Sequence, residues 1–283
     1  MKFHLSLNEI WRILYTHQKK DNLENHDFDI DDYKSNPYSY LKWKFYFLTS
    51  CPILYLLVRT EIKPNHVSLF YAFFGILTLF FLGFPSENKI YIYVGLLLAF
   101  TKTTIDACDG FLARLKNQKS ISGHMLDWYG AHVNAIGFQS GIGFYLANNE
   151  NEIFFYLAFL IPFFYAIKLK SFAYSTMFNE IAENKDYLDK THPVQINDDK
   201  NKEFKIKEKT KKYYKLFSSI LDDRARSVDL IILLFILELN FNLQFIKYIF
   251  YFLVLKHFII FLINIFIVSN NSWLEDKVNK IRK

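Results

Sequence analysis

The amino-acid sequence predicts an all-α integral membrane protein, a six-transmembrane-helix bundle with an N-terminal amphipathic or interfacial helix. Three observations support this fold class. Of the 283 residues, 52% are hydrophobic and 19% are aromatic. The apolar residues occur in long blocks rather than in short alternating or helical patterns. The chain nevertheless carries 22% charged residues, as expected of a membrane protein with cytosolic segments.

The N-terminal region precedes the long apolar blocks and is less apolar than they are. Residues 1–44 are polar to amphipathic and contain DFDIDDYKSNPYSY, so they predict a short helix followed by a cytosolic arm. The next apolar stretch, FYFLTSCPILYLLV, contains Pro52 and is too short to cross about 30 Å of hydrocarbon. Residues 45–60 are therefore predicted to form an interfacial or re-entrant helix.

Six longer blocks follow, each close to or above the roughly 17 residues that a spanning helix needs. They lie at about 66–84, 90–115, 124–147, 152–177, 226–243 and 245–268. Together they define a membrane domain over residues 61–270, interrupted by a lysine-rich cytosolic insert at about 179–222. Residues 271–283 form a basic cytosolic tail.

Loop charges predict the orientation of the bundle. The segments SENK, ANNENE and ELNFN hold a single Lys among them, whereas RLKNQKS, the insert and the tail are rich in Lys and Arg. Because cytoplasmic loops collect positive charge, both termini are expected inside, with the protein in the cytoplasmic (inner) membrane. Arg114 and Gly123 then lie at the cytosolic face, toward which the acidic stretch opens.

The excess of Lys and Arg over Asp and Glu has an ordinary explanation in a membrane protein. A formal net charge of +6 and a pI near 9.0 reflect cytosolic loops and their attraction to anionic lipids, so no nucleic-acid partner is predicted. The two cysteines, Cys51 and Cys108, lie in apolar context and form neither a disulfide framework nor a CxxC metal site.

The stretch DACDGFLARLKNQKSISGHMLDWYGAH places carboxylates at the ends of two apolar blocks. A charged side chain inside a bilayer is costly unless it is paired or hydrated, so such residues indicate a functional site. Asp106 and Asp109 are one turn apart on a helix, and Lys102 falls within about 40° of Asp106. Asp127 approaches the same point if the two helices pack side by side. Three carboxylates together with an Arg indicate a metal site that binds a phosphate-bearing ligand.

A structural alternative stays open at this point. Lys102 and Arg114 can neutralise the acids in buried helix-helix ion pairs with no catalytic role.

The same residues resemble the signature of the CDP-alcohol phosphatidyltransferase (CDP-alcohol phosphotransferase) family, D-x2-D-G-x2-A-R-x8-G-x3-D-x3-D. The match runs through Asp106, Asp109, Gly110, Ala113, Arg114, Gly123 and Asp127 at the correct spacing. The segment KPNHVSLF is similar to the family's Pro-Asn segment before its first helix, and six helices is the family's core count. The resemblance covers roughly residues 60–270.

The resemblance implies transfer of a phospho-alcohol group from a CDP-alcohol to an acceptor hydroxyl, with release of CMP. It implies that Asp106, Asp109 and Asp127 bind Mg²⁺ or Mn²⁺. It assigns the CDP moiety to Gly110, Ala113, Arg114 and Gly123. It also implies a homodimer. Lys102 and Asn134 are further substrate-binding candidates. Lys102 lies on the same side of its helix as Asp106, and Asn134 lies about 20° from Asp127 around the next helix.

The signature breaks at its fourth acidic position, which is Ala131. In the family this Asp is thought to accept the proton of the attacking hydroxyl, and a methyl group cannot. Asp127, His124 and His132 are the remaining catalytic candidates, since an imidazole titrates near neutral pH. His132 is turned about 100° from position 131. Alternatively, an acidic or metal-bound acceptor needs no side-chain base. A substitution of Asp by Ala made to trap the protein would give the same sequence.

Two arginines at the start of the fifth block, Arg224 and Arg226, are weaker candidates for docking a phosphate on the acceptor. Positive-inside anchoring of the helix end is the favoured explanation for both residues. The function predicted from sequence is thus a membrane-bound transferase, in phospholipid or related polar-lipid and envelope biosynthesis, acting among membrane lipids. The alternative is a non-catalytic family member that binds CDP-alcohol and metal as a scaffold, because of Ala131.

Overall fold

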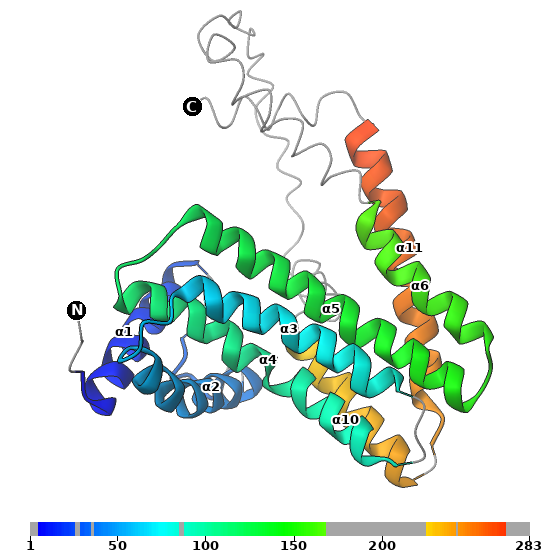
Figure 1. Cartoon of the computed structure of the whole chain (residues 1–283), viewed down its shortest axis with the longest axis horizontal. Coiled ribbons are helices and arrows are strands. Elements are labelled where there is room, and N and C mark those ends of the chain that lie inside the picture. The colour runs from blue at the N-terminus through cyan, green and yellow to red at the C-terminus, as the bar shows by residue number, and fades with distance from the viewer. Residues whose placement is uncertain are drawn as a thin grey trace, which may run out of the picture. The chain divides into compact units, whose positions relative to one another are not determined.

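The computed structural model describes residues 5–25, 29–34, 37–84, 88–167, 225–241 and 243–269. Within these ranges the regular structure is entirely helical, which confirms the all-α prediction for the described part of the chain (Figure 1). The helices found there are α1 (Leu7–Asn25), α2 (Pro37–Leu57), α3 (Pro64–Gly83), α4 (Ile90–Leu115), α5 (Ile121–Asn149), α6 (Ile153–Ala166), α10 (Ala225–Phe241) and α11 (Phe245–Ser269).

Three of the helices are long and apolar enough to cross a membrane: α3, α4 and the Phe245–Phe266 part of α11. The apolar helix α6 has 14 residues and ends at Ala166, and residues 168–177 of the predicted block at 152–177 lie outside the described residues. Helix α5 covers the predicted block at 124–147 but mixes polar residues into its length. The described residues thus support a membrane protein, and the count of six spans stays a prediction.

The chain forms two compact units, residues 1–145 and 146–283, and α5 passes from the first into the second. All three signature carboxylates belong to the first unit. The lysine-rich insert at 179–222, Arg224 and the tail at 271–283 lie outside the described residues, as does the side chain of Arg226.

Helices α1 and α2 support the back of α4. A buried apolar cluster joins one face of each helix, and from α4 it includes Cys108, Phe111 and Leu112. These three residues interleave with Asp106 and Asp109 in the sequence, so α4 has an apolar face toward α2 and an acidic face elsewhere. Helix α2 begins at Pro37 and continues through Pro52, so the helix predicted for residues 45–60 starts earlier, inside the stretch expected to be an arm.

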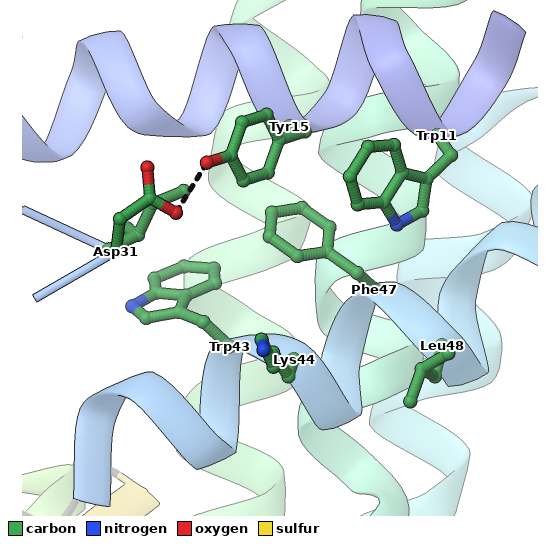
Figure 2. A pocket seen from close by; sticks show the side chains of 8 residues that line it. Trp11, Tyr15, Asp31, Trp43, Lys44, Phe47 and Leu48 are labelled. Atoms are coloured by element: carbon green, nitrogen blue, oxygen red, sulfur yellow. Dashed lines mark hydrogen bonds between the residues drawn. The ribbon is translucent and has the colours of Figure 1, made fainter. Parts of the chain in front are cut away.

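A small aromatic pocket lies between α1 and α2 (Figure 2). It measures about 200 Å³, and half of its lining residues are aromatic, among them the stacked pair Trp11 and Tyr15. Asp31 closes one side, where it accepts hydrogen bonds from the hydroxyl of Tyr15 and, at 2.5 Å, from Nζ of Lys19. These bonds hold the pKa of Asp31 below its usual range, Lys19 being the main cause. The segment before α2 is thereby fastened to α1.

Helices α3 and α5 cross at a pair of glycines. A Cβ at Gly137 would lie 2.1 Å from the carbonyl oxygen of Gly75, and a Cβ at Gly75 would lie 2.7 Å from the main chain of Asn134. Only residues without side chains allow the two backbones to approach so closely. Asn134 reinforces the crossing, because its Nδ2 donates to the carbonyl of Tyr71 at 2.7 Å. The crossing brings the start of α3 beside the start of α5.

The turn between α4 and α5 has a well-defined local geometry. Asn117 adopts a left-handed conformation with φ of 52°. The amide of Gln118 bonds the carbonyl of Ala113 at 2.8 Å, and that of Asn117 bonds Arg114 at 3.2 Å, which is a Schellman motif. Ser120 then caps α5, because its Oγ accepts the N–H of Gly123 at 3.0 Å. The turn fixes how far apart Arg114 and Gly123 lie.

In the second unit, α11 packs against α6 and α10. Glu238 of α10 accepts the amide hydrogen of Ile246 at 2.7 Å, which caps the start of α11. Lys247 in the same turn is paired with Glu150 at 3.8 Å. Farther along α11, Lys256 and His257 are buried, and the ring of His257 lies 4.9 Å from that of Tyr165.

Candidate functional site

Two signature carboxylates, one from each helix of the motif, lie in direct contact. The side chain of Asp106 in α4 is within hydrogen-bonding reach of Asp127 in α5, and Asp109 is close enough to act on both electrostatically. Like charges held this close repel each other unless a proton or a cation lies between them. The acidic residues thus converge in the folded chain. Asp106, Asp109 and Asp127 form an acidic point where α4 contacts α5.

Asp109 is held by the helix that precedes the motif in the sequence. Its Oδ2 accepts a hydrogen bond of 2.5 Å from Oγ of Ser68 in α3. Both residues are buried, at 6% and 2% exposure respectively. The hydroxyl therefore occupies one lone-pair direction of the carboxylate and limits its rotation.

Tyr71 reaches the same acidic point from α3. Its hydroxyl is hydrogen-bonded to Asp106, and Asp127 and Asp109 are its other charged neighbours. The side chain is 3% exposed. Its ring lies against Gly130, where a Cβ would approach Cδ1 to 2.5 Å. Tyr71 is thus packed on α5 while its hydroxyl points into the carboxylate cluster.

The small signature residues differ in what surrounds them. A Cβ on Gly110 would meet only Nη1 of Arg114, at 3.9 Å, so the space beside Gly110 is open. Glycine costs about 1 kcal/mol relative to Ala inside a helix, and no packing against the protein requires it here. A Cβ on Gly123 would instead lie 3.2 Å from Oδ1 of Asn65. Ala113 is partly buried. The open space beside Gly110 fits a ligand that approaches the backbone closely.

Two basic side chains of α4, Arg114 and Lys102, act electrostatically on the acidic residues. Arg114 is exposed, lies 5.4 Å over the ring of Phe111, and acts electrostatically on Asp109. Lys102 is 6% exposed and stands one turn deeper in α4, where it acts on Asp106. Lys116 ties the α2–α3 connection to α4 by donating to the carbonyls of Thr60 and Ile62, each at 2.8 Å. Partial burial lowers the pKa of the Lys116 ammonium.

The acidic residues fit a divalent cation that shares its ligands with a substrate. In the described ranges, no group of three acidic, histidine or cysteine side chains is assembled to hold a metal ion. The close pair is Asp106 with Asp127, whereas Asp109 is held by Ser68. Mg²⁺ commonly binds one or two carboxylates and completes its shell with water and phosphate oxygens. The pair therefore fits such an ion better than a closed cage of three carboxylates.

The residues considered as replacements for the missing fourth acid lie on the exposed side of α5. Ala131, His124 and His132 are all exposed. Nδ1 of His132 is 2.8 Å from the carbonyl of Trp128, and the indole ring of Trp128 contacts both imidazoles, with centroid distances of 6.1 and 6.4 Å. If Nδ1 carries the hydrogen, as this contact favours, the acceptor nitrogen of His132 is Nε2.

Asn134 occupies a different environment from the one expected of a substrate ligand. It is 1% exposed, and its Nδ2 donates to the carbonyls of Tyr71 and Gly130, at 2.7 and 2.9 Å. Its amide donor group is thus committed to helix packing. Its Oδ1 is buried without a hydrogen-bond partner.

Sequence reasoning missed the contribution of α3. Asn65, Ser68 and Tyr71 recur at helical spacing after Pro64, which opens the helix, and so share one face of α3. The Pro-Asn segment was recognised as a helix start, but no pattern in the chain indicated that this face contacts the motif. The spacing alone could have placed the three polar groups on one side of the helix.

Comparison with known families supports the reading of the motif. The family model described as CDP-alcohol phosphatidyltransferase matches residues 61–130. The match spans α3, α4 and the signature through Asp127, and it ends one residue before Ala131. No curated protein and no solved structure gave a significant match. Residues 61–130 are therefore similar to the CDP-alcohol phosphatidyltransferase family, whose signature the acidic motif resembles.

Proposed function

We propose that the protein is a membrane-bound CDP-alcohol phosphotransferase. It transfers a phospho-alcohol group, such as a phosphatidyl group, from a CDP-alcohol to an acceptor hydroxyl and releases CMP. The observation that carries this proposal is the contact between Asp106 and Asp127 beside the open space at Gly110, within a segment that matches a transferase family. The reaction belongs to phospholipid or related polar-lipid and envelope biosynthesis, with the site facing the cytosol.

Each group at the site has a role in this reaction. Asp106 and Asp127, with Asp109 behind them, would hold Mg²⁺ or Mn²⁺, which when bound offsets negative charge on the transferring phosphoryl group. Arg114 is suited to a phosphate oxygen of the CDP moiety, since it is exposed and carries a planar fork of donors. Gly110 leaves room for the donor, and Ala113 and Gly123 are assigned to the CDP moiety by their positions in the signature.

The proton of the acceptor hydroxyl requires a destination other than position 131. His132 presents Nε2 as its acceptor nitrogen if Nδ1–H bonds the Trp128 carbonyl, which makes it a base candidate. His124 is the second candidate. An acidic acceptor would need neither. We further propose a homodimer in the inner membrane, acting on lipid substrates that enter between the helices.

The test is CMP release by purified protein in liposomes, over CDP-alcohols that include CDP-diacylglycerol and over several acceptors. Mg²⁺, Mn²⁺ and EDTA are compared, and Asp106→Asn is measured beside Glu61→Gln, an exposed carboxylate outside the cluster. The proposal expects release that requires metal and acceptor, falls at least about 100-fold in Asp106→Asn, and is unchanged in Glu61→Gln. Metal-independent release, or equal rates in both variants, would refute the assignment.

Ala131 supports a second candidate, a subunit that binds CDP-alcohol and metal without turnover. The exposed methyl group at this position supplies neither a ligand nor a base. This candidate expects metal-dependent binding of a CDP-alcohol by the wild-type chain, no CMP from any pair of substrates, and release only after Ala131→Asp.

A further inference from the structure

We propose that Tyr71 is the positioning residue of the carboxylate cluster: its hydroxyl orients Asp106 for a divalent cation. The inference rests on the proposed function, because it concerns the same site, but it assigns a role to a residue of α3 that lies outside the acidic motif.

The first argument is the packing of the phenol ring. Gly130 leaves a slot in α5 that the ring fills, since a Cβ there would lie 2.5 Å from Cδ1 and 2.9 Å from Cε1. The carbonyl of Tyr71 is meanwhile bonded by Nδ2 of Asn134. Ring and backbone are thus both held by α5, so the position of the hydroxyl is set by rigid elements rather than by a mobile side chain.

The second argument is the environment of the hydroxyl. A buried hydroxyl without a partner costs free energy, and the partner of Tyr71 is the carboxyl of Asp106. Asp127 and Asp109 are its other charged neighbours. Ionised carboxylates only accept hydrogen bonds, so toward them the phenol acts as a donor. It then occupies one lone-pair direction of Asp106 and leaves other lone pairs of that carboxylate for a cation.

The third argument is that a second acid is oriented in the same way from the same helix. Ser68, three residues before Tyr71, donates to Oδ2 of Asp109. Two hydroxyls on one face of α3 thus each hold one carboxylate of α4. Groups that orient metal ligands in this manner commonly contribute 10- to 100-fold to metal affinity.

The test compares Tyr71→Phe with Tyr91→Phe in the intact protein. Tyr71→Phe keeps the ring in its slot and removes only the hydroxyl. Tyr91→Phe removes a hydroxyl from a ring that packs on Phe81 and Phe84, away from the acids. Mn²⁺ affinity is measured from the electron paramagnetic resonance signal of free Mn²⁺, and the unfolding temperature is measured in EDTA.

The expected result is an Mn²⁺ affinity about 10- to 100-fold weaker in Tyr71→Phe, wild-type affinity in Tyr91→Phe, and closely similar unfolding temperatures in EDTA for all three proteins. Wild-type Mn²⁺ affinity in Tyr71→Phe would overturn the inference while leaving the proposed function intact. A weaker affinity accompanied by a matching fall of the unfolding temperature in EDTA would overturn it too, because the residue would then be structural. A wild-type chain that neither binds Mn²⁺ nor releases CMP would overturn both.

Discussion

Gly137 of α5 lies directly against Gly75 of α3, so closely that a methyl group on Gly137 would approach the Gly75 carbonyl oxygen to 2.1 Å. The same two helices carry Asp127 and Ser68, which belong to the candidate site. The glycine contact therefore sets the distance across which the side chains of α3 reach the acidic cluster. Gly75 and Gly137 are thus required by helix packing, whereas Gly110 leaves space for a ligand.

We expect Gly137→Ala to destabilise the protein, whereas Gly110→Ala impairs ligand binding alone. The first substitution forces two backbones apart, and overpacking of this kind commonly costs about 1–3 kcal/mol. The second adds a methyl group where only Nη1 of Arg114 stands within 4 Å. Unfolding temperature in detergent and CDP-alcohol affinity are measured for both variants. Equal stability of Gly137→Ala and the wild-type chain would contradict the close contact.

Removal of the Ser68 hydroxyl is expected to weaken Mn²⁺ binding and CMP release by about 10- to 100-fold, because Asp109 loses the donor that orients it. Ser50→Ala is the matched control. Ser50 is equally buried, but its Oγ bonds the Tyr46 carbonyl of its own helix. Metal titration and initial rates are compared for Ser68→Ala and Ser50→Ala. Identical behaviour of the two variants would show that the bond to Asp109 has no functional role.

Restoring the fourth acid distinguishes the two candidate functions. If the protein is an enzyme with Ala131, its proton transfer does not depend on this position, and Ala131→Asp should alter the rate of CMP release by less than about tenfold. A general base typically contributes 10²- to 10⁴-fold. If the wild-type chain releases no CMP and Ala131→Asp raises the rate of release by that factor with the same substrates, the protein is a binding subunit.

The aromatic pocket between α1 and α2 should respond to acid. Because the folded-state pKa of Asp31 lies below its unfolded value, the contribution of its bonds to Lys19 and Tyr15 is complete above about pH 4. It is lost as the pH falls through the lower folded-state pKa. The effect is small, since exposed ion pairs contribute little.

Tryptophan fluorescence follows this transition in a background that retains Trp11 and Trp43 but replaces Trp128 and Trp273. The midpoint is expected below about pH 4, and Lys19→Met should move it upward, toward the ordinary value for Asp. A midpoint unaffected by Lys19→Met would argue against the pairing with Asp31.

The orientation predicted from loop charges can be measured directly. Cys51 and Cys108 are free and buried, so replacing both gives a background for single cysteines. A cysteine at Lys119 is expected to be shielded from a membrane-impermeant maleimide in intact cells, and one at Glu152 is expected to react. The reverse labelling pattern would place the acidic cluster outside the cytosol.

Much of the candidate site could be predicted from the sequence because it lies on two consecutive helices. Residues one turn apart share a helix face, so the approach of Asp106 and Asp109 follows from their spacing. The start of α3 at Pro64 also follows from local chemistry. The earlier start of α2, at Pro37, was not predicted, because the polar and aromatic segment there was assigned to the arm. In the structure, Trp43 of this segment packs against the apolar cluster that α2 shares with α1 and α4.

By itself, the sequence determined the all-α class, the positions of the acidic motif, and the family to which residues 61–130 are matched, since spacing along a helix is a local property. Only the tertiary structure decided which helix supports these acids. Ser68 and Tyr71 meet Asp109 and Asp106 because α3 packs on α4 and crosses α5 at a glycine contact. Such contacts join residues far apart in the chain, and no periodicity in a single segment encodes them.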